Sequence, residues 1–132
     1  MEKESLFGPH LTIDGKKCNI DSLKNQEAVF NVLNNLPKEL GMTKITMPYV
    51  VPWVDKWANT PGISGFVMIA ESHISIHTFP DDDYIFIDIF SCMEFNTDKA
   101  IEYLKNAFSI KKLTINIIKR GIDFPRKWQM IE

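Results

Sequence analysis

The stretch of residues 64–80 constrains the fold of this chain more than any other part of the sequence. Residues 66–70 form an apolar run, and residues 74–78 alternate between apolar and polar side chains. Both patterns predict β-strands. Between them stand Glu71, Ser72 and His73, where no Gly, Pro or Asn supplies the usual turn chemistry. We therefore expect that something other than local turn preference holds this junction in place.

The hydrophobic pattern elsewhere predicts four more strands and two helices. Strands are expected at 10–13, at 43–51 with an interruption at Pro48, at 84–90 and at 113–117, whereas 52–62 is expected to be a loop. One helix is expected to start at Asp21-Ser22, to end or kink at Pro37 and to stop by Gly41. Its apolar positions are Leu23, Val29, Leu33 and Leu36, and those of a second helix, capped by Asn96-Thr97, are Ala100, Ile101, Leu104, Ala107 and Phe108.

Strands in long antiparallel runs with two amphipathic helices predict a two-layer α/β sandwich, a mainly antiparallel sheet with both helices on one face. With 132 residues, the chain is expected to be a single domain that folds without stabilising cross-links such as disulfides. Neither a repeat nor a low-complexity segment interrupts it.

Charge and cysteine content limit the classes of function. The net charge is −2 and the basic residues form no cluster, so nucleic acid is not expected as a partner. No apolar run approaches the roughly 20 residues that cross a bilayer, and the N-terminus lacks the pattern of a signal peptide. We therefore expect a cytoplasmic protein without a membrane partner, in which Cys18 and Cys92 are thiols rather than a disulfide.

The ten residues from Glu71 to Pro80, Glu-Ser-His-Ile-Ser-Ile-His-Thr-Phe-Pro, resemble the processing site of the pyruvoyl-dependent S-adenosylmethionine decarboxylases of the short bacterial and archaeal type. The resemblance includes Phe7-Gly-Pro-His10-Leu, Cys18, Ser64-Gly65 and Asp88-Ile-Phe-Ser-Cys92, and it weakens at 47–62 and over the last dozen residues. It implies the same α/β sandwich and a chain that cuts itself into 1–71 and 72–132.

The resemblance also implies roles for individual residues. Ser72 would be the precursor of a pyruvoyl group, which forms a Schiff base with the substrate, and Glu71 would supply the carbonyl of the cleaved bond. His77 and, less firmly, Ser64 would assist processing, and Cys92 would return a proton to the substrate after carbon dioxide leaves. Such a pyruvoyl cofactor fits a chain that has neither a Gly-rich phosphate loop nor an obvious lysine site for pyridoxal phosphate.

Substrate contacts are less sharply indicated. Phe7, Trp53 and Trp57 are aromatic residues available to enclose an adenine ring. Asp81 occupies the position of a family glutamate that holds ribose hydroxyls, and it is one methylene shorter. The acidic turn at 81–83 would equally suit a cationic substrate, so arginine or ornithine decarboxylation on the same fold stays an alternative.

Other interpretations stay open from the residues alone. A chain of this kind can also be a non-catalytic relative that regulates an active subunit, although retention of Ser72, His77 and Cys92 favours the enzyme. His10 and His73 are either functional or simply packed within the sheet. The three histidines lack carboxylate or cysteine partners at diagnostic spacing, so no metal site is expected. The family resemblance further implies a homodimer of processed protomers.

Overall fold

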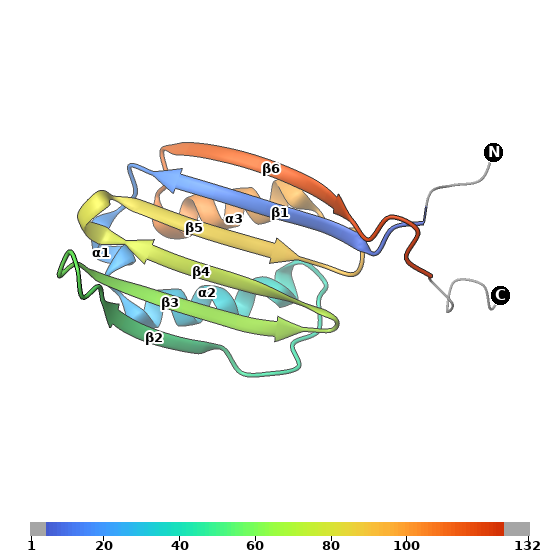
Figure 1. The fold of residues 1–132 in the computed structure, drawn as a ribbon, viewed down its shortest axis with the longest axis horizontal. Helices are drawn as coiled ribbons and strands as arrows, with labels where there is room; N and C mark the ends of the chain where they lie inside the picture. The colour runs from blue at the N-terminus through green and yellow to red at the C-terminus, as the bar shows by residue number, and fades with distance from the viewer. Residues whose placement is uncertain (1–4, 126–132) are drawn as a thin grey trace.

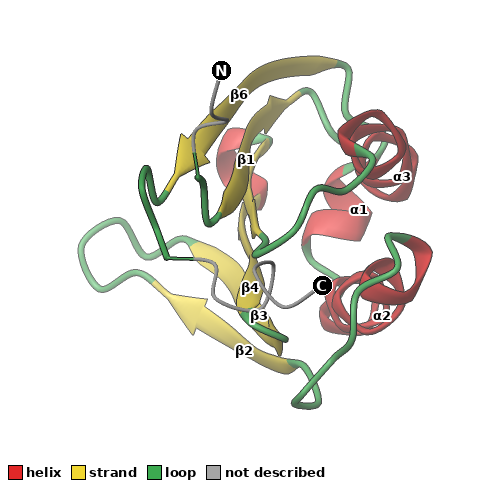
Figure 2. Ribbon diagram, turned by 90° about the vertical axis from the view of Figure 1, so that its right-hand side faces the viewer, coloured by secondary structure: helices red, strands yellow, loops and turns green. Residues whose placement is uncertain are grey.

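The structure is a computed structural model that describes residues 5–125 of the chain (Figure 1). Within this range the strands form one layer of the fold and the helices form the other (Figure 2). The elements are β1 (Gly8–Lys16), α1 (Ile20–Leu23), α2 (Gln26–Glu39), β2 (Tyr49–Val54), β3 (Pro61–Ile69), β4 (Ser72–Phe79), the 3₁₀ turn η1 (Pro80–Asp82), β5 (Tyr84–Phe90), α3 (Thr97–Phe108) and β6 (Lys112–Arg120).

The strands form one six-stranded sheet in the order β2-β3-β4-β5-β1-β6, and every neighbouring pair is antiparallel. β1 comes first in the sequence and is inserted between β5 and β6. The helices all lie against the same face of the sheet (Figure 2). The predicted two-layer sandwich is confirmed, with the short helix α1 as an addition.

Alternation along the central strands creates the core. In β4, Ile74 and Ile76 are fully buried beneath the helices, while the intervening Ser75 and His77 point to the other face. Burying one such side chain stabilises the fold by about 1.5–3 kcal/mol. Neighbouring strands and helices complete the same cluster with Leu11, Ile13, Ile85, Ile87, Ile89, Val29, Leu33, Leu36, Leu104 and Phe108.

Two asparagines set the first helical segments. The side chain of Asn19 accepts a hydrogen bond from the amide of Ser22, and that of Asn25 accepts one from the amide of Ala28. The expected start at Asp21-Ser22 is therefore wrong, because those residues lie inside α1 and Asn25 caps α2. Gly41 follows α2 with a φ of 72°, as a helix stop requires. Asn96 caps α3 as predicted.

The edge strand β2 differs from the prediction. Before Pro48 the only pairing in the described chain is the isolated bridge of Lys44 with Ile69, so residues 43–48 are not a regular strand. β2 then extends to Val54 and includes Pro52, which was expected in a loop. An edge strand tolerates this proline because one side of its backbone needs no partner. The loop that joins β2 to β3 shrinks to residues 55–60.

The face of the sheet opposite the helices, called the open face below, is not covered by any described element (Figure 2). It carries the alternate side chains of all six strands, including the polar residues His10, Ser64, His73, His77 and Asp88. Its apolar residues are 40–64% exposed and include Tyr49, Trp53, Phe66, Met68, Phe79 and Phe86. Exposed apolar side chains gathered on one face of a sheet indicate an interaction site.

Candidate active site

The turn between β3 and β4 is held by Cys92, which lies just beyond the end of β5. The amide of Glu71 donates to Cys92 Sγ at 3.4 Å, and the thiol donates to the carbonyl oxygen of Ala70 at 3.5 Å. On the other side, the amide of Ala70 donates to the carbonyl of Thr43 at 3.0 Å. These contacts explain how a junction without turn residues is fixed, and they place the Cys92 thiol against the Ala70-Glu71 peptide, one residue before the Glu71-Ser72 bond.

Gly8 helps to bring Cys92 to this turn. A Cβ atom at position 8 would lie 1.8 Å from the carbonyl oxygen of Ser91, so only glycine allows β1 to approach the segment that carries Cys92. The amide of Ser91 also donates to the carbonyl of Pro9 at 3.1 Å. The Phe7-Gly8-Pro9-His10 motif therefore acts on the junction through the backbone.

Ser72, the first residue of β4, has a buried hydroxyl group for which the described residues offer no hydrogen-bond partner. An unsatisfied buried hydroxyl costs about 1–3 kcal/mol, and such groups in native structures are often held for a reaction. The hydroxyl adjoins the carbonyl of Glu71 through one amide bond. A nucleophile without a competing partner beside a fixed carbonyl is the arrangement that self-cleavage requires.

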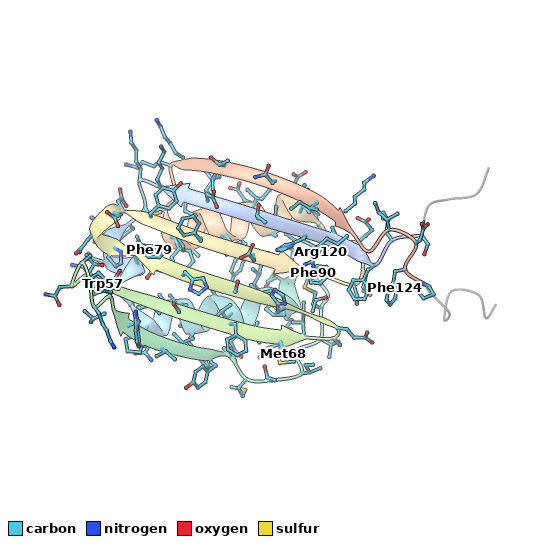
Figure 3. All side chains as sticks on the ribbon, viewed as in Figure 1. Trp57, Met68, Phe79, Phe90, Arg120 and Phe124 are labelled. Carbon is cyan, nitrogen blue, oxygen red and sulfur yellow. The ribbon has the colours of Figure 1, made fainter. Side chains whose placement is uncertain are left out.

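A pocket of about 490 Å³ opens beside Ser72. Its lining combines the turn between β3 and β4, named the processing turn after the family resemblance, with side chains of the open face. The lining includes Met68, Glu71, Ser72, His73, Phe90 and Arg120. In Figure 3, Phe90 and Arg120 lie together at the end of the sheet that carries this turn. Phe7 packs on the ring of Phe90 with centroids 5.4 Å apart, so it lies next to the pocket.

A chain of polar contacts crosses four strands, β4, β5, β1 and β6, beside the pocket. Ser75 Oγ donates to Asp88 Oδ2 at 3.4 Å, and His10 Nε2 lies 3.2 Å from Asp88 Oδ1. Arg120 Nη1 lies 3.4 Å from His10 Nδ1. Sequence reasoning had assigned no site role to Ser75, Asp88 or Arg120. Strand alternation could have grouped Ser75 with His73, whereas the approach of Arg120 depends on β6 pairing with β1.

His73 lies among these groups, with its ring edge-on to the rings of His10 and Phe90. Burial lowers the pKa of His73 below its ordinary value near 6.5, and the nearby His10 and Arg120 lower it further, against the opposing effect of Asp88. His73 is therefore neutral at pH 7 beside the Glu71-Ser72 bond.

Ser64 and His77 form a separate pair. They face each other across β3 and β4, with Ser64 Oγ 2.8 Å from His77 Nδ1, in a second pocket of about 350 Å³ on the open face. His77 is five residues from Ser72 along β4, about 16 Å at the rise of a strand, and its side chain points to the opposite face. The structure does not bring this pair to the Ser72 of the same chain.

The remaining predicted substrate contacts also lie away from Ser72. Trp53 lies on the edge strand β2, and Trp57 is 97% exposed at the opposite end of the sheet (Figure 3). Asp81 lies in η1 at the same distant end and is exposed. The neighbouring Asp83 has a structural contact, because its carboxylate accepts from the amide of Cys18 at 2.7 Å.

The two cysteines are not joined to each other, and their surroundings differ. Burial, aided by the negative charge of Asp83, raises the pKa of the Cys18 thiol to about 11. Cys18 therefore stays protonated at neutral pH and is poorly suited to proton exchange. This contrast favours Cys92, which contacts the processing turn, as the reactive cysteine.

Within residues 5–125, no group of three or more His, Cys, Asp or Glu side chains is arranged to hold a metal ion. In the same part of the chain, every helix is too short or too polar to cross a membrane.

Residues 9–121 match the family model described as S-adenosylmethionine decarboxylase. This match spans every strand of the sheet and both halves of the processing site. The chain belongs to the S-adenosylmethionine decarboxylase family.

Two relatives support this assignment, and one solved structure shares the fold. The chain is 44% identical over 115 residues to an S-adenosylmethionine decarboxylase proenzyme of Clostridium botulinum (strain Langeland), with 86% of this chain and 94% of the relative covered. It is 39% identical over 117 residues to the proenzyme of Thermodesulfovibrio yellowstonii, covering 88% and 82%. The crystal structure of the adenosylmethionine decarboxylase from Aquifex aeolicus shares the fold, with a TM-score of 0.74 at 24% identity over 89% of this chain and 93% of that chain.

The environment of His73 gives a testable titration. We expect the ring proton signals of His73 to inflect below pH 6.5 in uncut Ser72→Ala protein, because burial disfavours its charged form. The unfolded chain then binds the additional proton first, so the free energy of unfolding should fall as the pH drops through 6.5 toward the lower folded pKa. NMR titration measures the inflection, and His73→Gln identifies the signal. An inflection at or above pH 6.5 would contradict the assignment.

Proposed function

We propose that this protein is a self-processing decarboxylase that acts on S-adenosylmethionine through a pyruvoyl group made from Ser72. The observation that carries the proposal is the convergence of the two reactive groups on one turn: the unpartnered hydroxyl of Ser72 and the thiol of Cys92, which contacts both Ala70 and Glu71. The names of the relatives supply the substrate. They do not favour arginine or ornithine decarboxylation, or a regulatory subunit.

Processing would start at the Ser72 hydroxyl. Its oxygen attacks the carbonyl carbon of Glu71, the bond to the Ser72 nitrogen breaks, and the chain is joined through an ester. Loss of the Ser72 α-proton then expels the Glu71 carboxylate and leaves dehydroalanine. Addition of water releases ammonia and leaves a pyruvoyl group at the start of the second fragment. The chain would then consist of fragments 1–71 and 72–132.

The residues around Ser72 fit such a group. A ketone at position 72 would supply the electron sink that decarboxylation needs. Cys92, held at the same turn, would deliver a proton to the substrate carbon once carbon dioxide has left. The apolar side chains of Met68 and Phe90 form part of the pocket wall and would help to exclude water once the open face is covered. The product would serve as an aminopropyl donor for polyamine synthesis in the cytoplasm.

A second copy of the chain would complete the processing site. A general base must lie within hydrogen-bond reach of the proton it takes, and His77 is about 16 Å along the strand from the Ser72 of its own chain. The Ser64-His77 pair lies instead on the open face, among exposed apolar side chains such as Phe66. We propose a homodimer in which two open faces pack together and the pair of one chain serves the Ser72 of the other.

This arrangement would also give the distant substrate residues a role. Trp53, Trp57 and Asp81 are too far from Ser72 to bind the same substrate within one chain. Face-to-face packing of two sheets with opposed strand directions would bring the η1 end of one chain over the turn of the other. Phe7, by contrast, is already beside the pocket of its own chain through Phe90.

The first test is the intact mass of freshly purified protein under denaturing conditions. We expect two fragments split between Glu71 and Ser72, the second beginning with pyruvoyl, together with release of carbon dioxide from S-adenosylmethionine. Ser72→Ala should give one uncut, inactive chain, because no hydroxyl remains to attack. A Ser72→Ala chain that retains full activity would refute the proposed function.

Substitution of the two cysteines separates processing from catalysis. Cys92→Ala should still be cut, but decarboxylation should fall by about 10²–10⁴-fold because the positioned proton donor is lost. Cys18→Ser serves as the matched control and should stay within a few-fold of the parent, since the Cys18 thiol is protonated and away from the turn. Equal loss of activity in both variants would exclude a specific role for Cys92. Mass spectra and carbon dioxide release provide the two readouts.

Co-expression tests whether His77 acts on the other chain. Ser72→Ala and His77→Ala should each remain uncut when expressed alone. In a mixed dimer, the His77→Ala chain retains Ser72 and meets the intact His77 of the Ser72→Ala chain, so it should be cut. Two tags of different mass identify the cut chain. If the His77→Ala chain stays uncut in verified mixed dimers, His77 acts within its own chain or not at all.

A further inference from the structure

The guanidinium of Arg120 is held in place by contacts that leave its charge unneutralised. Its central carbon lies 4.1 Å from the centroid of the Phe90 ring, and Nη1 lies 3.4 Å from His10 Nδ1. The first contact is a cation–π interaction, and the second uses one of five N–H donors. Among the described residues, no carboxylate oxygen forms an ion pair with Arg120.

Asp88 fixes the orientation of His10, and His10 in turn fixes the position of Arg120. Because arginine only donates hydrogen bonds, His10 Nδ1 must accept, which places the ring proton on Nε2. Nε2–H then donates to Asp88 Oδ1 at 3.2 Å, while Asp88 Oδ2 accepts from Ser75 at 3.4 Å. The side chain of His10 is only 17% exposed, so its ring is fixed between β5 and β6. Asp88 therefore orients the histidine that orients the guanidinium.

Arg120 lines the same pocket as Ser72. Within that lining it is the only side chain that carries a permanent positive charge, and the Phe90 ring on which it lies belongs to the same lining, as do Met68 and His73. A guanidinium with unused N–H donors beside apolar walls is suited to bind a planar anion through two parallel hydrogen bonds. The pocket therefore combines the reaction centre with an anion-binding group.

We propose that Arg120 binds the α-carboxylate of the substrate, an inference that rests on the proposed function. In an α-amino acid the amine and the carboxylate are attached to the same carbon. When the amine is joined at position 72, the carboxylate must lie within a few ångströms of it, inside the pocket that Arg120 lines. His10 and Asp88 act as positioning residues for the guanidinium, and Phe90 supports its flat face.

This role makes a specific kinetic prediction. The interaction exists with the bound substrate and is lost as the carboxylate becomes neutral carbon dioxide, so Arg120 should contribute to substrate binding and not to the chemical step. Arg120→Gln should raise the KM for S-adenosylmethionine about 10- to 100-fold, the range of a charge-assisted hydrogen bond, without lowering kcat. Arg120→Lys keeps the positive charge but loses the pair of parallel N–H donors, so it should raise the KM by a smaller factor.

The decarboxylated product is the decisive probe, because it lacks only the carboxylate. Its inhibition constant should change less than about threefold in Arg120→Gln, while the KM for S-adenosylmethionine rises. Lys119→Gln removes the same charge from the neighbouring position of β6, which faces away from the pocket, and should behave like the parent. Intact mass confirms that every variant is fully cut before kinetics are measured.

Parallel changes for substrate and product, or no change for either, would overturn the inference. The first result would mean that Arg120 supports the pocket or pairs with the new carboxylate of Glu71 after cleavage. If Arg120→Gln is not cut, His10→Phe takes its place, and the KM should rise about three- to tenfold with the product constant unchanged. A parent protein that neither cuts itself nor releases carbon dioxide refutes the proposed function, whereas an active parent with an unaffected Arg120→Gln refutes only this inference.

Discussion

The register of β4 between β3 and β5 is the constraint on which the rest of the site depends. Ile74 and Ile76 must face the helices to complete the core, so His73, Ser75 and His77 must face the open side. A slip of one residue would bury the polar residues and expose both isoleucines, at a cost of several kcal/mol. The same register places Ser72 at the turn and His77 about 16 Å away from it. Core packing thus determines which groups can meet within one chain.

The processing turn shows how a candidate catalytic group can also have a structural contact. Cys92 Sγ accepts from the amide of Glu71 and donates to the carbonyl of Ala70, satisfying backbone groups that a glycine or asparagine turn would otherwise arrange. Ser72, in contrast, is left with a buried hydroxyl that no described group satisfies. Cleavage next to this turn would release Glu71 from the strand that follows, while the contacts of Cys92 with Ala70 and of Ala70 with Thr43 continue to hold the first fragment.

Much of the fold was predictable because the local signals agree with the packing. The strand expected at 84–90 is β5, and Asn96 caps α3, since alternation and capping chemistry point to the same answer there. The extent of β2 was not predictable, because whether a proline such as Pro52 interrupts a strand depends on whether that strand lies at an edge. Likewise, Asp21-Ser22 and Asn25 are all good capping residues, and only the packing of α2 on the sheet selects Asn25.

The residues of the candidate site also fall into two groups, those that the sequence predicts and those that only the fold brings together. Glu71, Ser72 and His73 are adjacent in sequence, so a motif can reveal them without any knowledge of the fold. Arg120 lies 110 residues from His10, and the two meet only because β1 pairs with β6 in one register.

The spatial separation of the polar groups along the sheet has a chemical consequence. One end of the sheet carries Ser72, Cys92 and Arg120, whereas the Ser64-His77 pair lies nearer the middle of the open face. A face this exposed cannot exclude water by itself, yet decarboxylation through an electron sink gains from a dry site. Packing a second apolar face on it would remove water, strengthen the contact of Arg120 with an anion and deliver a base to Ser72. A chain of 132 residues has no further element to cover its own sheet within the described range, so the same association would satisfy all three needs.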